Sequence, residues 1–388
     1  MSPPTLDFSE VRCSPAAEGL PRRDYIILPV ISLLTIVVMF AVTEICARIF
    51  WPAQPANACL ILDPINGNRY KTNCTTQTKI AEGPWTTNNY NECGYFSATS
   101  CKTKPVGSVR IVVLGSSTGE GTRVPYEETF FSLASSALSR ICNRSIDVQN
   151  LSVEGLHPIQ VLLRIKEAIG LRPDVVLFVL CPGDVGEAQE LAEPDNAAPT
   201  VAPDSTGRLV KVKLWLKGLS LQSRAALLAQ HFLLQNKEVL LRLHLRFGDR
   251  IEQPRAPGWQ ARFAALDLIV GKLADQLHSE GVPLILVSVP SRPQAAMLGL
   301  RQLPPDVDPF AFGRQVDRIA ANHGAGYVDM SEVFSHIPDS ENLFYVVDGH
   351  PTVEGQKVIA QYVEQKLQDG SVPAFSHCTQ QLSVARGD

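Results

Sequence analysis

Three residues from distant parts of the sequence, Ser117, Asp348 and His350, could together perform acyl transfer. Ser117 follows an aliphatic run, 109–114, and stands among small residues that favour a sharp turn. Asp348 and His350 share a loop ahead of a segment with helical spacing, 356–367. Acyl transfer can be performed by a hydroxyl nucleophile, an imidazole base and an orienting carboxylate. We therefore predict that Ser117 attacks an acyl carbonyl, that His350 takes the serine proton, and that Asp348 orients the imidazole.

Each of these residues also has a purely structural interpretation. A Gly-x-Ser sequence after a strand can be an ordinary turn. Asp348 could cap the helix that begins near Thr352, because aspartate is a favoured N-cap residue, and Thr352 could do the same. The chain has seven other histidines, and none of them, for example His157, His278 or His336, stands in a setting comparable to that of His350.

The three candidates depend on a parallel sheet that brings them to one edge. Short apolar segments, typical of buried strands, alternate with segments of helical spacing. This alternation predicts an α/β fold, with a parallel five-stranded, flavodoxin-like sheet in a three-layer sandwich. Ligands of such sheets bind at the carboxyl ends of the strands, where backbone N–H groups can stabilise an anion. The predicted strands are 109–115, 146–153, 174–181, 282–289 and 326–330, and the predicted helices are 127–141, 158–169, 259–279, 310–323 and 356–367.

The segment Gly115-Ser-Ser-Thr-Gly-Glu-Gly121 resembles the first sequence block, Gly-Asp-Ser-x-Thr-x-Gly, of the SGNH or GDSL-like hydrolases. The second block, a glycine after the second strand, is matched by Gly155, and the third, Gly-x-Asn-Asp, falls at 181–184. The order of serine first and acid and histidine last also fits, and the resemblance covers roughly 108–367. It implies a serine hydrolase with an oxyanion hole that includes the backbone N–H groups of Ser117 and Gly155.

Three positions depart from the family pattern. Ser116 replaces the aspartate of the first block. Gly183 replaces an asparagine whose side chain donates to the oxyanion, and loss of one such donor typically lowers turnover by about 10²–10³-fold. Gly183 could offer a backbone N–H instead, and the next residue, Asp184, could pair with a turn amide. The acid stands two residues before His350, a spacing that the acetylation proteins of envelope polysaccharides also use.

Residues 25–47 form an apolar stretch that carries no charge before Glu44, which is long enough to cross a bilayer. The basic pair Arg22 and Arg23 predicts a cytoplasmic amino-terminal side, with the catalytic domain outside the cytoplasm. A cleaved signal peptide is the alternative, but the run exceeds the usual ~7–15 residues and no clear small-x-small site follows closely. A buried core helix is a further alternative, although this stretch lacks a polar face.

The composition of the chain predicts five parts in sequence. Residues 186–258 interrupt the alternation of strands and helices, and this helical insertion could be a lid, a membrane-facing pair of helices, or helices that pack on the sheet. The five parts are a disordered cytoplasmic tail (1–24), a transmembrane helix (25–47), a cysteine-containing extracytoplasmic linker (48–107), an SGNH hydrolase-like domain (108–370) with the insertion 186–258, and a C-terminal tail (371–388).

Six of the cysteines in the part that we predict to be exported are candidates for disulfides, which are plausible outside the cytoplasm. A zinc site is the competing interpretation, but the chain has no Cys-x-x-Cys pair and no histidine from 1 to 156. We therefore predict disulfides of open connectivity and no metal. The six are Cys59, Cys74, Cys93, Cys101, Cys142 and Cys378.

The charge of the chain argues against nucleic acid as a partner. The 388 residues carry a formal net charge of -4, and basic residues are dispersed except around 211–217. A flavodoxin-like cofactor protein is also disfavoured, because the segment 115–121 lacks the glycine spacing of Walker or dinucleotide-binding loops. We expect no cofactor.

These observations predict a membrane-anchored serine esterase or O-acyltransferase. Its expected substrate is a small ester or an extracytoplasmic glycan that carries acyl groups, most simply acetyl. The alternative, motivated by Ser116 and Gly183, is a catalytically degenerate SGNH-like protein that binds glycan or scaffolds an envelope export or assembly system.

Overall fold

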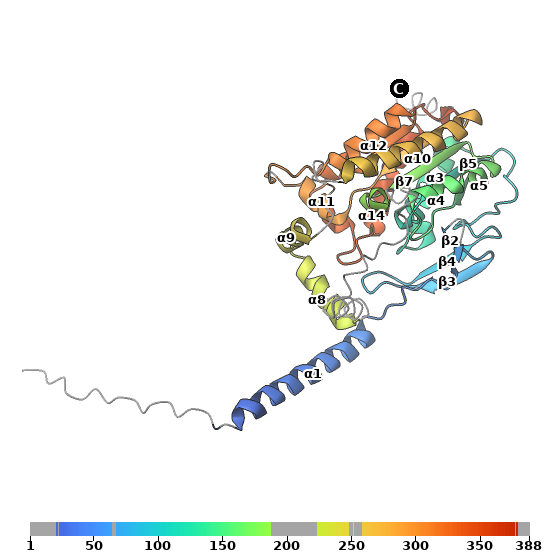
Figure 1. Ribbon diagram of the computed structural model, residues 1–388. Helices are drawn as coiled ribbons and strands as arrows, with labels where there is room; N and C mark the ends of the chain where they lie inside the picture. Colours follow the sequence, from blue (N-terminus) through green and yellow to red (C-terminus); the bar gives the residue numbers. More distant parts are fainter. Residues whose placement is uncertain are drawn as a thin grey trace, which may run out of the picture.

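The computed structural model describes residues 21, 23–63, 67–187, 223–247, 251, 258–300, 302–376 and 378 (Figure 1). Most of the predicted tails and much of the predicted insertion lie outside the described residues.

The centre of the protein is a five-stranded parallel sheet. Numbered along the chain, its strands have the spatial order 2-1-3-4-5, which is the flavodoxin-like arrangement. Ile111 of the first strand, for example, pairs with Val148 on one side and Val175 on the other. The predicted fold class and its five strands are confirmed, although some strands end earlier than predicted. They are β5 (Val109–Gly115), β6 (Ile146–Asn150), β7 (Val175–Leu180), β8 (Leu284–Ser288) and β9 (Gly326–Asp329).

Helices form a layer on each side of this sheet, as a three-layer sandwich requires (Figure 1). In one layer α3 (Phe130–Cys142) packs against α14 (Val353–Leu367). In the other, α10 (Trp259–Ser279) contacts its neighbours α4 (Pro158–Leu163), α5 (Ile165–Gly170) and α12 (Ala311–Asn322). Every residue of β5 and β7 is buried, which explains why these strands are nearly continuous apolar runs.

The segment 48–107, predicted as a linker, contains two antiparallel hairpins. Tyr70 and Tyr90, one from each hairpin, stack with ring centroids 4.0 Å apart and belong to the same buried core as the sheet. Phe96 forms a bridge to Asn150 at the end of β6. This segment therefore shares its hydrophobic core with the sheet. The hairpins are β1 (Leu60–Asp63) with β2 (Gly67–Tyr70), and β3 (Cys74–Thr78) with β4 (Thr86–Tyr90).

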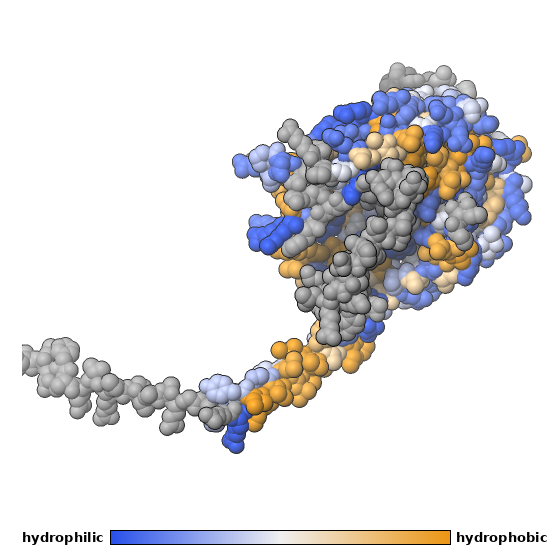
Figure 2. All heavy atoms as spheres, in the orientation of Figure 1, coloured by the Kyte–Doolittle hydropathy of each residue, from blue (hydrophilic) through white to orange (hydrophobic). Residues whose placement is uncertain are grey.

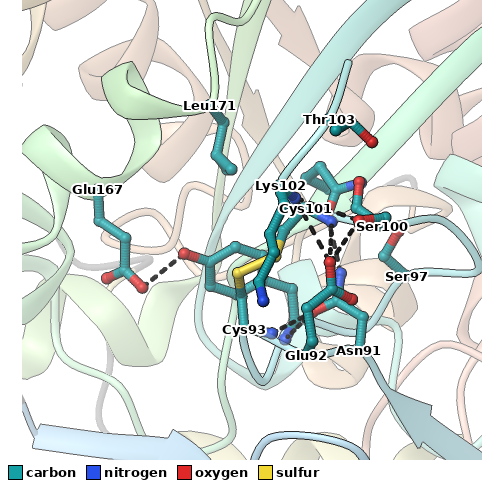
Figure 3. Close-up of a disulfide and its surroundings, with 12 residues drawn as sticks. Asn91, Glu92, Cys93, Ser97, Ser100, Cys101, Lys102, Thr103, Glu167 and Leu171 are labelled. Atoms are coloured by element: carbon teal, nitrogen blue, oxygen red, sulfur yellow. Dashed lines mark hydrogen bonds between the residues drawn. A yellow bond between two sulfur atoms is a disulfide. The ribbon is translucent and has the colours of Figure 1, made fainter. Parts of the chain in front are cut away.

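Three disulfides link the six cysteines that the sequence suggested for this role. Two close loops within the hairpin segment, and the third ties the C-terminal region to the last residue of α3. Figure 3 shows one of them beside Glu92, whose carboxylate accepts the backbone N–H of Cys101 at 3.1 Å. The pairs are Cys59–Cys74, Cys93–Cys101 and Cys142–Cys378.

The helix α1 (Asp24–Phe50) extends away from the rest of the protein and is lined with apolar side chains (Figures 1 and 2). Its long apolar stretch is not buried within the protein. A helix of this length and composition could be a membrane anchor or a signal sequence. Near its carboxyl end it contacts α8 (Arg224–Leu234), which is followed by α9 (Lys237–Phe247). Both helices come from the predicted insertion.

Candidate active site

Ser117 stands on a sharp turn between β5 and the short helix α2 (Ser117–Glu120). Gly115, just before the turn, has a φ of +154°, and a Cβ atom there would lie 2.8 Å from the carbonyl oxygen of Val179. A side chain therefore does not fit at this position. Ser116 is extended and Ser117 begins the helix, which leaves Ser117 partly exposed at the carboxyl end of β5. The sequence predicts the nucleophile at this edge.

The structure brings Ser117, His350 and Asp348 into one chain of hydrogen bonds. Nε2 of His350 lies 2.8 Å from Oγ of Ser117, and Nδ1 lies 2.6 Å from Oδ1 of Asp348. A proton on Nδ1 would leave Nε2 able to accept the serine proton, which is what a general base requires. Thr352 rather than Asp348 caps α14, because Oγ1 of Thr352 accepts the N–H of Gly355 at 3.3 Å. The carboxylate of Asp348 faces the imidazole instead.

Arg123 contacts the far side of the Asp348 carboxylate. Its Nε lies 3.3 Å from Oδ2 of Asp348, and its Nη2 lies 2.6 Å from Oε1 of Glu154. Burial raises the pKa of Asp348, but the hydrogen bond and charge of His350 and the charge of Arg123 lower it by more, so the pKa falls below its ordinary value. Asp348 is therefore ionised at neutral pH. Sequence reasoning missed Arg123, because nothing in its local sequence indicates this partner.

Glu82, between β3 and β4, holds the loop that carries Asp348. Its carboxylate accepts the backbone N–H of Val347 at 2.9 Å and that of Asp348 at 3.1 Å. The same carboxylate lies 2.5 Å from Nδ1 of His231 in α8, and only 6% of the Glu82 side chain is exposed. Glu82 therefore positions the acid through the backbone. Sequence reasoning missed it too, because no sequence signal places this segment beside the loop.

We expect Glu82→Gln to lower kcat/KM for a short ester by up to about 10²-fold, the effect of a displacement of about 1 Å. Both oxygens of Glu82 accept backbone N–H groups of the loop, and the NH2 group of glutamine cannot accept a hydrogen bond. The loop should therefore shift. Glu92→Gln is a matched control, since this carboxylate also accepts backbone N–H groups in the hairpin segment but belongs to the Cys93–Cys101 loop. Full activity in Glu82→Gln, with thermal unfolding unchanged, would contradict the positioning role.

The predicted oxyanion donors Ser117 and Gly155 lie just after the adjacent strands β5 and β6. Ser117 is the first residue of α2, so its backbone N–H has no acceptor within the helix. Gly155 has a φ of +71°, a conformation in which other residues are strained. The N–H of Val153 donates to the carbonyl oxygen of Gly115 at 3.3 Å, which holds this loop against the nucleophile turn.

The third predicted donor, Gly183, lies in α6 (Pro182–Glu187), which follows β7. It is exposed, and a Cβ atom there would meet only Sγ of Cys181, at 3.7 Å, which is an ordinary contact. This position therefore has no side-chain donor but has room for one. Asp184 is buried, and its Oδ2 accepts the N–H of Cys181 at 2.7 Å, as a turn residue would.

Glu120 is a buried carboxyl group that joins the nucleophile turn to the hairpins. Its oxygens lie 2.7 Å from the hydroxyl of Tyr70, 3.2 Å from that of Tyr90 and 3.0 Å from the backbone N of Glu154. Burial raises the pKa of Glu120 to about 8, because the hydrogen bonds from the two tyrosines offset only part of the lost hydration. At neutral pH the carboxyl is therefore mostly protonated.

This raised pKa predicts a measurable dependence of stability on pH. The carboxyl has a pKa of about 8 in the folded protein and an ordinary value of 4.5, so folding takes up a proton between these values. The free energy of unfolding should fall as pH rises through this window, by at most about 1.4 kcal/mol per pH unit. Glu120→Gln should remove this contribution and stabilise the protein most at pH 8 and above.

Chemical denaturation of the parent and Glu120→Gln between pH 5 and pH 9 measures this difference. Glu127→Gln, at an exposed position seven residues later, serves as the control, and its stability should depend on pH as that of the parent does. Identical pH dependence in all three proteins would mean that Glu120 is already ionised when folded.

Among the residues that the structure describes, no group of three or more His, Cys, Asp or Glu side chains could hold a metal ion.

No protein-family model matches the chain, and no curated protein matches its sequence. Solved structures resemble it only distantly. The lipase/acylhydrolase from Enterococcus faecalis is 12% identical with a TM-score of 0.40, and the match covers 67% of this chain and 95% of that one. A catalytic mutant of Axe2, an acetylxylan esterase from Geobacillus stearothermophilus, is 14% identical with a TM-score of 0.39, over 69% and 99% of the two chains. TesA is 15% identical with a TM-score of 0.37, over 67% and 98%.

Proposed function

We propose that this chain is a serine esterase or O-acyltransferase with Ser117 as its nucleophile. The observation that carries the proposal is the arrangement in which His350 lies 2.8 Å from Oγ of Ser117 and 2.6 Å from Oδ1 of Asp348. A nucleophile in contact with a base, and that base in contact with an acid, is the geometry by which such enzymes are recognised on unrelated folds.

In the first half of the proposed reaction, His350 takes the proton of Ser117 as Oγ attacks the ester carbonyl. Asp348 stabilises the imidazolium, and the backbone N–H groups of Ser117 and Gly155 donate to the oxyanion. The ester C–O bond then breaks, His350 protonates the leaving alcohol, and the acyl group remains on Ser117. In the second half, water or a glycan hydroxyl attacks the acyl-serine while His350 takes its proton. The bond between Oγ of Ser117 and the acyl carbon then breaks, His350 returns that proton to Oγ, and the free acid or the acylated glycan leaves.

We propose further that α1 anchors the chain in a membrane, with the sheet domain outside the cytoplasm. The length and apolarity of α1 support this, as does the basic pair Arg22 and Arg23 just before it. Three disulfides fit an oxidising compartment. An enzyme held there would meet the polymers of the cell envelope, so we propose an acylated, most simply acetylated, glycan or a small ester as substrate.

The experiment that tests the substrate class measures two products at once. Purified full-length protein is given an acetylated glycan or a short acetyl ester, with and without a second glycan as acceptor. Released acetate reports hydrolysis, and acetylated acceptor reports transfer. Activity that requires both Ser117 and His350 supports the proposal, and its absence with every donor and acceptor contradicts it.

We expect Gly183→Asn to raise turnover by about ten- to a hundredfold, somewhat less than the ~10²–10³-fold lost when such a donor is removed. The added side chain has room at this exposed position and would supply the donor that the glycine lacks. The gain should disappear in the Ser117→Ala background, because an oxyanion forms only when the nucleophile attacks. No gain in a normally folded Gly183→Asn would mean that position 183 does not face the oxyanion.

The missing side-chain donor at Gly183 is also the observation that favours the alternative, a non-catalytic glycan-binding or scaffold protein. If neither the parent nor Gly183→Asn has Ser117-dependent activity with water or glycan as acceptor, this alternative becomes preferable. Glycan binding by the Ser117→Ala protein would then be the next measurement.

A further inference from the structure

The carboxyl end of α1 is fastened to the beginning of α8 by one carboxylate. Glu44 of α1 accepts the hydroxyl of Ser223 at 2.8 Å and the backbone N–H groups of Arg224 and Ala225 at 3.2 and 2.9 Å. Arg48, one turn later in α1, donates to the same carboxylate at 2.6 Å. Glu44 therefore satisfies the first turn of α8, and its own charge is satisfied by four donors.

The position of Glu44 along α1 sets the depth at which α8 begins. The 20 residues from Tyr25 to Glu44 span about 30 Å at about 1.5 Å per residue, which is the thickness of a bilayer's hydrocarbon core. If α1 spans the membrane, as the proposed function holds, Glu44 lies where the hydrocarbon ends. The first turn of α8 then starts at the same level, beside the headgroups.

The face that α8 leaves exposed is apolar. Ala229, Phe232 and Leu233 follow the i, i+3, i+4 spacing of a single helix face, and 65% of Phe232 and 51% of Leu233 are exposed. The next helix differs, because the exposed residues of α9 include Glu238 and Arg242. A helix with an exposed apolar face, fastened at the boundary of a bilayer, has the properties of an interfacial helix.

A hollow of about 550 Å³ lies between α1 and α8. Its walls are mainly apolar, and Phe50, at the end of α1, is 82% exposed beside it. A second pocket, of about 250 Å³, shares Trp51 and Glu82 with the first and reaches Val347 and Asp348. The candidate active site therefore lies one small pocket away from the hollow at the end of α1.

We propose that α8 is an interfacial helix that binds the lipid bilayer, with phospholipid acyl chains against its exposed face and in the hollow beside α1. Phe232 of this face and Phe50 of α1 are both exposed and line the same hollow, and this continuity of apolar surface between α8 and α1 favours lipid over a protein partner. The surface area of three side chains is also far smaller than the about 800 Å² that each partner buries in a standard interface between proteins. This contact would hold the site containing Ser117 at the membrane surface, where it would meet substrates attached to or lying close to the bilayer.

Nitroxide labels on full-length protein in phosphatidylcholine–phosphatidylglycerol vesicles test this proposal. Labels are introduced as Phe232→Cys and Leu233→Cys in a background that carries Cys13→Ser, Cys46→Ala and Cys181→Ala. Val37→Cys, in the middle of α1, is the lipid reference, and Val106→Cys, a fully exposed position before β5, is the water reference. Accessibility to oxygen, which concentrates in lipid, is compared with accessibility to a water-soluble nickel chelate.

We expect both α8 labels to be several-fold less accessible to the nickel chelate than the Val106→Cys label, and to be accessible to oxygen. Nickel accessibility equal to that of Val106→Cys would overturn the proposal, and protection from both reagents would overturn it in favour of a protein partner. If the label at position 37 is itself in water, the membrane anchor fails. If an α8 label is in water while the label at position 37 is in lipid, the α8 proposal fails and the membrane anchor stands. Thermal unfolding of each labelled variant verifies its fold, and the two α8 positions check one another.

Discussion

Replacing Ser117 by alanine is expected to lower the hydrolysis of a short acyl ester by about 10⁴–10⁶-fold. The hydroxyl is the only group at the end of β5 within hydrogen-bonding distance of His350 in the described structure. Without it no acyl-enzyme can form, and the remaining rate comes from binding and from the oxyanion donors alone. The same substitution should abolish labelling by a fluorophosphonate, which reacts with an activated serine whether the acceptor is water or glycan.

Ser116→Ala is the matched control for this experiment, because it removes a neighbouring hydroxyl from the same turn. Its backbone carbonyl accepts the N–H of Glu120 at 2.9 Å, and this bond survives the substitution. We expect labelling and activity to be retained within about tenfold, as for a residue that does not perform the chemistry. Persistent labelling in Ser117→Ala, or loss of labelling only in Ser116→Ala, would show that Ser117 is not the nucleophile.

The sheet and the order of its strands could be predicted because buried parallel strands leave a strong local signal. Strands such as β5 and β7 are covered on both faces, so their residues must be almost continuously apolar. Each predicted strand is followed by a segment of helical spacing, and right-handed crossovers then leave few possible topologies. The carboxyl edge of this sheet, and therefore the location of Ser117, followed from the same argument.

The support around the candidate site could not be predicted in this way. Glu82 and Arg123 reach Asp348 across more than 200 residues of sequence, and neither has a local pattern that names its partner. The hairpins β1–β4 were missed because β2, β3 and β4 are short and rich in polar residues, and β1 is an apolar run of only three residues. The hydrogen bonds from Tyr70 and Tyr90 to Glu120 join distant parts of the sequence and can be recognised only in the folded chain.

The second large effect is expected from Asp348→Asn, which should lower turnover by about 10⁴-fold while leaving the fold intact. The carboxylate now accepts on both sides, from Nδ1 of His350 at 2.6 Å and from Nε of Arg123 at 3.3 Å. An asparagine amide can offer its oxygen to only one of them. The positively charged Arg123 should bind the amide oxygen more strongly than His350 does, so the NH2 group of the asparagine would face Nδ1 of His350. His350 would then carry its proton on Nε2 and could not accept the proton of Ser117.

Arg123 is therefore expected to determine how much turnover the Asp348→Asn protein loses. In the double variant Asp348→Asn with Arg123→Met the amide is free to turn its oxygen toward His350, so we expect about tenfold recovery over Asp348→Asn alone, within the usual 0.5–3 kcal/mol range of couplings between touching residues. Arg123→Met alone should lose some activity, because it removes a charge that keeps Asp348 ionised and leaves Glu154 without this partner. Turnover of all four proteins completes the cycle. Additive losses would show that the amide does not choose between the two donors, and an Asp348→Asn protein with activity close to that of the parent would show that Asp348 does not orient His350.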